Sequence, residues 1–246
     1  MTKWLLAPAA IVSLSFLVFL PSTGRTATGT MAPSARTASA VATQSTPAVG
    51  PAYPLKMSAN RRYFVDQNNV PVLVIGDSPQ SLLVNVAAAD QATYFANRQA
   101  RGFNAALVDV LCSTYTGGRA DGKTAYSGNI APFTSGSGPA DYDLSTPNET
   151  YFALLDATIN LAASQGIVVF LDPIETGSWT LTLTNNGSTK ATNYGAYLGN
   201  RYKNFPNIVW FHGNDFEGGC CPVNSTNNNL VGNVITGINS ADTNHL

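Results

Sequence analysis

Short, continuously apolar segments alternate with segments of helical spacing along most of the chain. The apolar runs cover residues 70–75, 103–111, 167–171 and 207–212. The intervening stretches predict helices over about 90–101, 146–165, 192–203 and 223–239. Strands that are apolar on both faces and joined by helices are typical of a parallel sheet, so the pattern predicts an α/β fold. A barrel and a doubly wound sheet both fit this order of elements.

The clearest helix start is at residues 146–149. Thr146 as N-cap, Pro147 at the first helical position and Glu149 two residues later predict a capping box. The apolar face behind it consists of Phe152, Leu155, Ile159 and Ala162, and Gly166 ends the helix. Farther towards the amino terminus, residues 62–66 and 70–75 flank Gln67-Asn68-Asn69, which predicts a small β-hairpin.

The amino-terminal segment has the layout of a secretory signal peptide. Lys3 precedes an apolar run from Leu5 to Leu20, which Pro21 ends. This run is shorter than the about 20 residues that a membrane-spanning helix needs. We therefore expect a signal peptide at 1–25, an Ala/Ser/Thr/Pro-rich linker at 26–53 and one partial catalytic domain at 54–246. The protein is then secreted and has no membrane association after cleavage.

Composition excludes several classes of protein. With 44% apolar residues the chain is not disordered, and a net charge of -1 excludes the basic surface of a nucleic-acid binder. Neither a phosphate-binding P-loop nor a G-x-G-x-x-G turn follows a predicted strand, so a nucleotide has little support as a ligand. Cys112, Cys220 and Cys221 are an odd number of thiols, and their pairing stays open.

Carboxylates gather where the predicted strands end. They are Asp77, Asp109, Asp172, Glu175, Asp215 and Glu217. The carboxyl ends of parallel strands lie at one edge of a sheet, where barrel enzymes keep their active sites. Two carboxyl groups at such an edge suit glycoside hydrolysis, although single acids there also cap helices. Aromatic side chains that could contact the apolar faces of a sugar are Tyr115, Tyr126, Trp179 and Trp210, and Trp210 within a strand equally suits a core position.

An ordered series of motifs resembles one family. The motifs are PLKMSANRRYFVD at 54–66, VIGDSP at 74–79, RGFN at 101–104, TPNETYF at 146–152 and RYKNFPNIVWFHGND at 201–215. Together they resemble the apiosidase-like glycoside hydrolases, from about Pro54 to Leu246. The turn after the first strand lacks that family's usual Trp, and Gly213-Asn214 replaces its Gly-Gly.

The resemblance implies a (β/α)8 TIM barrel, of which this chain holds about the first four β/α units after a small hairpin. It also implies that Asp215 is the general acid/base and that Asp77 lines the sugar site. The family's nucleophile is a Glu on a later strand, which we expect beyond Leu246. We expect an oligo- or polysaccharide substrate, no cofactor and no metal. The full set of expected substrate-binding residues is Asp77, Asn214, His212, Asp172, Glu175 and Trp179.

Two other functions remain open. The chain could be a secreted, non-catalytic carbohydrate-binding remnant that keeps the edge of the barrel but lacks the nucleophile. It could also be a metal-dependent hydrolase that uses His212 and Asp215 together with Asp77. The sequence leaves open which sugar is bound, whether configuration is retained and what the oligomeric state is.

Overall fold

The computed structural model describes residues 50–126, 128–214 and 225–246. The predicted signal peptide and nearly all of the predicted linker lie outside these ranges. Asp215, Glu217, Cys220 and Cys221 also lie outside them. None of the helices in the described part of the chain has the length and hydropathy needed to span a membrane.

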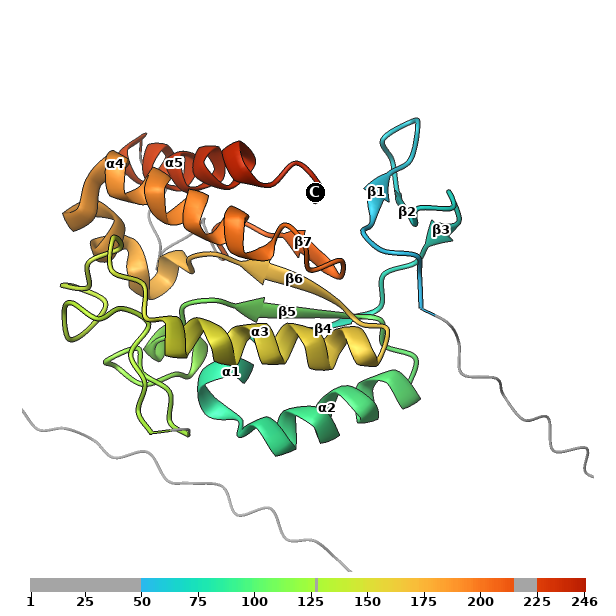
Figure 1. Ribbon diagram of the computed structural model, residues 1–246, viewed down its shortest axis with the longest axis horizontal. Coiled ribbons are helices and arrows are strands. Elements are labelled where there is room, and N and C mark those ends of the chain that lie inside the picture. The colour runs from blue at the N-terminus through green and yellow to red at the C-terminus, as the bar shows by residue number, and fades with distance from the viewer. Residues whose placement is uncertain (1–49, 127, 215–224) are drawn as a thin grey trace, which may run out of the picture. The chain divides into compact units, whose positions relative to one another are not determined.

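The strands form two sheets (Figure 1). The smaller sheet is antiparallel and contains β1 (Lys56–Met57), β2 (Phe64–Val65) and β3 (Pro71–Val72). The larger sheet is parallel, in the order β4 (Gly76–Asp77), β5 (Ala105–Asp109), β6 (Val168–Asp172) and β7 (Ile208–Trp210). The predicted α/β class with a parallel sheet is therefore confirmed.

Helices connect the parallel strands. They are α1 (Leu82–Asn85), α2 (Ala88–Ala100), α3 (Glu149–Ser164), α4 (Thr176–Tyr202) and α5 (Ser225–Ala241), with a short 3₁₀ turn at Thr114–Thr116. The helix expected at 192–203 is only the second half of α4. Gly187, with φ of 71°, interrupts the helical backbone within α4. This conformation is accessible to glycine at little cost.

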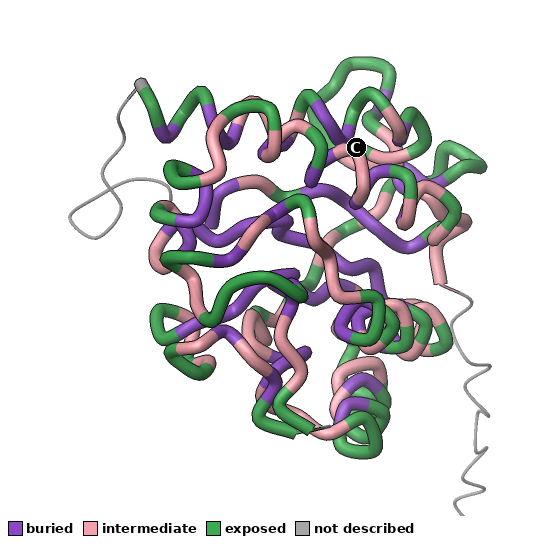
Figure 2. Tube along the Cα trace, turned by 60° about the vertical axis from the view of Figure 1, so that its left-hand side comes forward, coloured by how far each residue is buried: buried purple, intermediate pink, exposed green. Residues whose placement is uncertain are grey.

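The two faces of the parallel sheet have different partners. One face packs against the helices through Ala106, Val108, Val169, Leu171 and Ile208. The other face carries Ala105, Val168 and Val209, which pack against Leu55 beside the small sheet. In Figure 2 the buried positions gather in the interior of the trace and the exposed positions lie mostly around its outside. In Figure 1 the arrows of β5 and β6 point away from the small sheet, which therefore lies near the amino ends of these strands.

The hairpin prediction is confirmed, but the apolar run 70–75 is not the first parallel strand. Its beginning, β3, pairs with β2, and parallel pairing starts only at Gly76. The Asn104 side chain explains the gap, since it donates to the Leu73 carbonyl and accepts from the Ile75 N–H, at 2.7 Å in each case. At residues 73–75, hydrogen bonds from the Asn104 side-chain amide thus take the place of regular strand pairing with β5.

The predicted capping box is wrong. The N-cap of α3 is Asn148, whose side-chain oxygen accepts from the Thr150 N–H at 3.1 Å. The Thr146 hydroxyl donates instead to the Asp143 carbonyl, and Pro147 forms a β-bridge with Phe133. Residues 146–147 therefore belong to the preceding turn, and the helix begins two residues later than that box requires.

Glycines set the contact between α4 and α5. A Cβ on Gly195 would lie 2.1 Å from the Val234 carbonyl oxygen, and one on Gly237 would lie 2.0 Å from the Thr192 carbonyl oxygen. Real Cβ atoms do not approach backbone so closely, so the two helix backbones meet at these positions. Gly232, also in α5, has no atom within 4 Å of such a Cβ.

We expect Gly195→Ala to destabilise the fold by about 2 kcal/mol or more, because the added methyl group forces the packed helices apart. Gly232→Ala is the matched control and should stabilise the protein by up to about 1 kcal/mol through helix propensity. Urea unfolding of the two variants measures both effects. Equal stabilities would contradict the proposed close contact.

Candidate active site

Asp109 and Asp172 are the last residues of two neighbouring parallel strands. They are Cα partners in the register of β5 with β6. Since side chains alternate along a strand, Asp109 shares a face with Ala105, and Asp172 shares that same face with Val168. Both acids are fully buried. The sheet thus brings two carboxyl groups together at its carboxyl edge.

The carboxylate of Asp172 accepts three backbone hydrogen bonds, each at 3.3 Å. Oδ1 accepts from the N–H groups of Ile174 and Gly213, and Oδ2 accepts from the Asn214 N–H. Burial raises the pKa of Asp172 to about 7, against the opposing effect of these bonds. The segment after β7 is thereby tied to the end of β6.

Asp109 has a different environment. Neither of its carboxylate oxygens has a hydrogen-bond partner within the described ranges. Burial raises the pKa of Asp109 to about 9, and the charges of Asp172 and Glu175 act in the same direction. Glu175 is also fully buried and directly precedes α4. A carboxyl group with this environment is a neutral acid near pH 7.

Asp77 lies on the opposite face of the sheet. Its register partner is Ala106, which belongs to the helix-facing core. The Asp77 carboxylate pairs with Arg98 of α2 and accepts from the Tyr94 hydroxyl, both at 3.0 Å. Burial alone would raise the pKa of Asp77, but these partners and the Ser78 N–H lower it. The structure separates Asp77 from the other two acids, and its contact with a sugar stays a prediction.

Two other expected site residues follow β7. Asn214 is buried, and its carbonyl accepts from the Thr176 hydroxyl at 3.1 Å. His212 is partly exposed, and burial lowers the pKa of its imidazole to about 4, so the ring is neutral near pH 7. Asp215 is the next residue after Asn214 but lies outside the described residues. Its assignment as general acid/base therefore stays a prediction.

The structure corrects the expectation that Trp179 binds substrate. The ring is fully buried and stacks on Tyr142 at a centroid distance of 5.8 Å, so it offers no face to a sugar. Trp210 is also a core residue, and its indole N–H donates to Asp242 at 2.8 Å. Tyr115 differs from both, since it is 37% exposed in the loop after β5.

Tyr115 is held against the start of α4. Its backbone N–H donates to the Ser178 hydroxyl at 3.1 Å, and a Cβ on Gly177 would lie 2.4 Å from its ring. Gly177 therefore leaves room for the Tyr115 ring beside Glu175. The sequence offered no spacing signal for this arrangement, because the two residues are far apart in the chain and meet only in the fold.

Cys112 is a fully buried thiol that is free within the described ranges, and because Cys220 and Cys221 lie outside them, the pairing of the three cysteines stays open. Within residues 50–126, 128–214 and 225–246, no group of three His, Cys, Asp or Glu residues could hold a metal ion. The alternative metal set includes Asp215, so that hypothesis is not tested by this finding.

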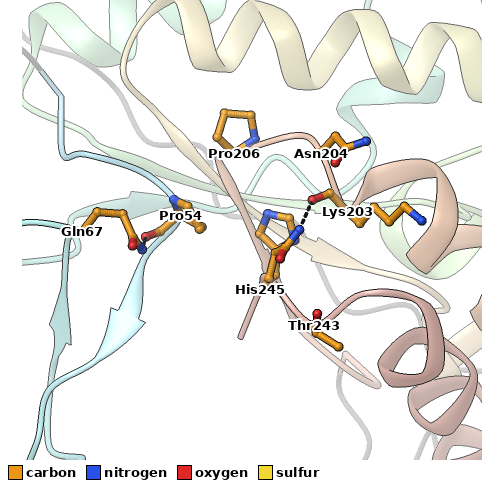
Figure 3. Close-up of a pocket in the computed structure, with 8 residues that line it drawn as sticks. Pro54, Gln67, Lys203, Asn204, Pro206, Thr243 and His245 are labelled. Atoms are coloured by element: carbon orange, nitrogen blue, oxygen red, sulfur yellow. Dashed lines mark hydrogen bonds between the residues drawn. The ribbon is translucent and has the colours of Figure 1, made fainter.

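A cavity of about 520 Å³ lies elsewhere in the protein (Figure 3). Pro54 and Gln67 line one side of it, and the other side is formed by the loop before β7 and the segment after α5, where Asn244 donates to the Lys203 carbonyl. The loop at 203–206 leads into the amino end of β7. This cavity is therefore at the opposite end of the strands from Asp109 and Asp172, and none of the described residues that line it is an Asp or a Glu.

A family model described as the catalytic domain of apiosidase-like proteins matches residues 58–246. The chain belongs to the apiosidase-like family. A search of curated proteins finds no match. The family match confirms the resemblance drawn from the five sequence motifs.

Solved structures share the fold at low sequence identity. A glycoside hydrolase matches with a TM-score of 0.61 and 22% identity, over 79% of this chain and 40% of its own. A family 5 glycoside hydrolase from Bacteroides vulgatus matches with a TM-score of 0.60 and 22% identity, over 78% of this chain and 38% of that protein. The endo-1,4-beta-mannanase from Rhizomucor miehei matches with a TM-score of 0.58 and 16% identity, over 78% of this chain and 59% of that protein. This chain thus spans about 40% of the length of the first two, and its sheet is of the TIM-barrel type.

The buried acid Asp109 makes stability depend on pH. Its pKa is raised on folding, so the folded state binds more protons than the unfolded state between about pH 4 and about pH 9. Stability should fall as pH rises through this interval, by up to about 1.4 kcal/mol per pH unit from one such group. Asp109→Asn should remove most of the slope between about pH 7 and about pH 9 in urea unfolding, because below about pH 7 the raised pKa of Asp172 contributes a slope of the same sign.

Asp143→Asn is the control for that slope. The ion pair with Lys190 helps to lower the pKa of Asp143 to about 2, so this acid is charged in both states above pH 5. The control should lose stability by the same amount at every pH from 5 to 9. A slope that Asp109→Asn leaves unchanged would show that Asp109 is not the group responsible.

Proposed function

We propose that this chain supplies the acid/base half of the active site of a secreted glycoside hydrolase. Asp215 would act as the general acid/base, and the nucleophile would come from a later strand of a complete barrel. The substrate would be a side chain of a plant or microbial polysaccharide. Membership of the apiosidase-like family and the fold shared with glycoside hydrolases support the class of reaction.

The observation that carries this proposal is the carboxyl edge of the sheet. Asp109, Asp172 and Glu175 are buried there, and Asp172 binds the backbone of Gly213 and Asn214, which immediately precede Asp215. Hydrolysis of a glycoside needs one carboxyl group that protonates the leaving oxygen and a second that attacks or activates water. Burial raises the pKa of Asp109 and of Asp172, and surroundings that favour the protonated form of a carboxyl group favour the first of these roles.

Tyr115 supports a sugar as the ligand. Its ring is partly exposed and is fixed between the loop after β5 and the first turn of α4. An aromatic face in this position can pack against the C–H groups of a sugar ring. Asn214 would add a hydrogen bond to a sugar hydroxyl through its side-chain nitrogen, which is buried and has no hydrogen-bond partner among the described residues.

Asp215→Asn should lower hydrolysis by roughly 100-fold or more, because the amide cannot transfer the proton. The variant is made in the protein that contains this chain together with the rest of its barrel, and release of reducing sugar is measured. Asp90→Asn, an exposed acid in the first turn of α2, is the matched control and should keep full activity. Retained hydrolysis by Asp215→Asn would remove the acid/base assignment. Sugar binding without turnover by the unaltered protein would favour the carbohydrate-binding alternative.

Tyr115→Ala should weaken oligosaccharide binding by roughly 10-fold, the order expected for the loss of one aromatic contact. Tyr115→Phe should bind like the unaltered protein, because it keeps the ring. Tyr63→Ala is the control, because Tyr63 is a partly exposed tyrosine that immediately precedes β2. Calorimetric titration with oligosaccharides measures all three, and equal affinities for the two alanine variants would contradict a sugar contact at Tyr115.

A further inference from the structure

The backbone that follows β7 is fixed by side chains from two other segments. Gly213, with φ of 71°, and Asn214 donate their N–H groups to the two oxygens of Asp172. The Thr176 hydroxyl, from the first turn of α4, donates to the Asn214 carbonyl. We call residues 213–214 the post-β7 turn. The turn thus donates hydrogen bonds through its N–H groups to the end of β6 and accepts one through its carbonyl group from α4.

The ionised form of Asp172 is the better acceptor for the donors around it. Three N–H groups converge on its two oxygens, and a carboxylate accepts them without offering a competing proton. Hydrogen bonds to a charged acceptor are worth about twice those to a neutral one. The charge state of Asp172 therefore sets how firmly the turn is held.

The protonation state of Asp109 determines whether a second negative charge lies beside Asp172. It is the register partner of Asp172, is fully buried and has no hydrogen-bond partner in the described part of the chain. Two adjacent buried carboxylates without a cation strongly disfavour double ionisation. The described residues contain no ion pair from Lys or Arg to either acid.

We propose that Asp172 is a positioning residue for the post-β7 turn, and that Asp109 is the acid that keeps its proton so that only Asp172 is charged. This inference rests on the proposed function only in that the turn leads directly into Asp215. Among the described residues, the titratable groups on the surrounding elements are Glu175, Cys112, Tyr151, Tyr194 and His212. Burial keeps the thiol and the two tyrosines protonated and the imidazole neutral near pH 7.

Amide hydrogen exchange of Gly213 and Asn214 in the full chain tests the proposal, after correction for intrinsic exchange. Protection of both amides should rise as pH increases from about 6 to about 8, where Asp172 ionises. Asp172→Asn should reduce protection by roughly 10-fold or more and abolish the step, because the charged acceptor is lost. A step of unchanged size and midpoint in this variant would overturn the assignment to Asp172.

Two variants separate positioning from general loosening of the fold. Thr176→Val removes the hydroxyl donor to the Asn214 carbonyl, so it should lower protection at every pH and leave the midpoint unchanged. Asp109→Asn replaces a neutral acid by a neutral amide, so the profile should match that of the unaltered protein. A midpoint moved to lower pH in Asp109→Asn would show that Asp109 is charged there and would overturn its part of the proposal.

If Asp172→Asn does not fold, the pH profiles of amide exchange in the unaltered protein and in Thr176→Val still test the proposal. The absence of a step between about pH 6 and about pH 8 in both would contradict the proposal. Exchange is measured without substrate, so its outcome is independent of catalysis by Asp215. Loss of the acid/base assignment through Asp215→Asn would therefore leave this result unaffected.

Discussion

Parallel hydrogen bonding between β5 and β6 sets Asp109 opposite Asp172, and the alternation of side chains places both carboxyl groups on the face away from the helices. A shift of this register by one residue would send one acid towards the helix layer, where Asp77 lies. The remaining features of the edge depend on this pairing. The post-β7 turn binds the acid that β6 supplies, and Thr176 follows from the same strand end.

The acidic side chains fall into two groups, which differ in whether a cation lies beside the carboxyl group. Asp77 pairs with Arg98, and Glu149 pairs with Arg201, so the pKa of each of these carboxyl groups is lowered. Asp109 and Asp172 are buried with no cationic partner in the described part of the chain, and their pKa values are raised. Burial of an unpaired carboxyl group costs stability, and a chain with 11% charged residues has few charges to place in this way. Acids held at such a cost are typical of functional sites.

Local patterns predicted the elements whose stability is local. The spacing of Phe152, Leu155 and Ile159 gave the buried face of α3, and the run at 167–171 gave β6 almost to the residue. The extent of α4 was missed because its first half is rich in Thr and Asn, which have low helix propensity, and it is held by tertiary contacts such as that of Asn186 with Tyr142. The start of α3 was misplaced because Thr146 is used by the preceding turn.

The candidate site was predictable as an edge but not as a set of contacts. Acids at strand ends indicated where chemistry would lie, yet only the register separates Asp77 from Asp109. Trp179 looked suited to a sugar by residue type, but it fills the core beside Tyr142.

Carbon-13 NMR titration of the assigned side-chain carboxyls of Asp109 and Asp172 tests the central pairing most directly. We expect separate transitions, near pH 7 for Asp172 and near pH 9 for Asp109. Ionisation of both groups near pH 4, the ordinary range of an exposed carboxyl, would contradict it.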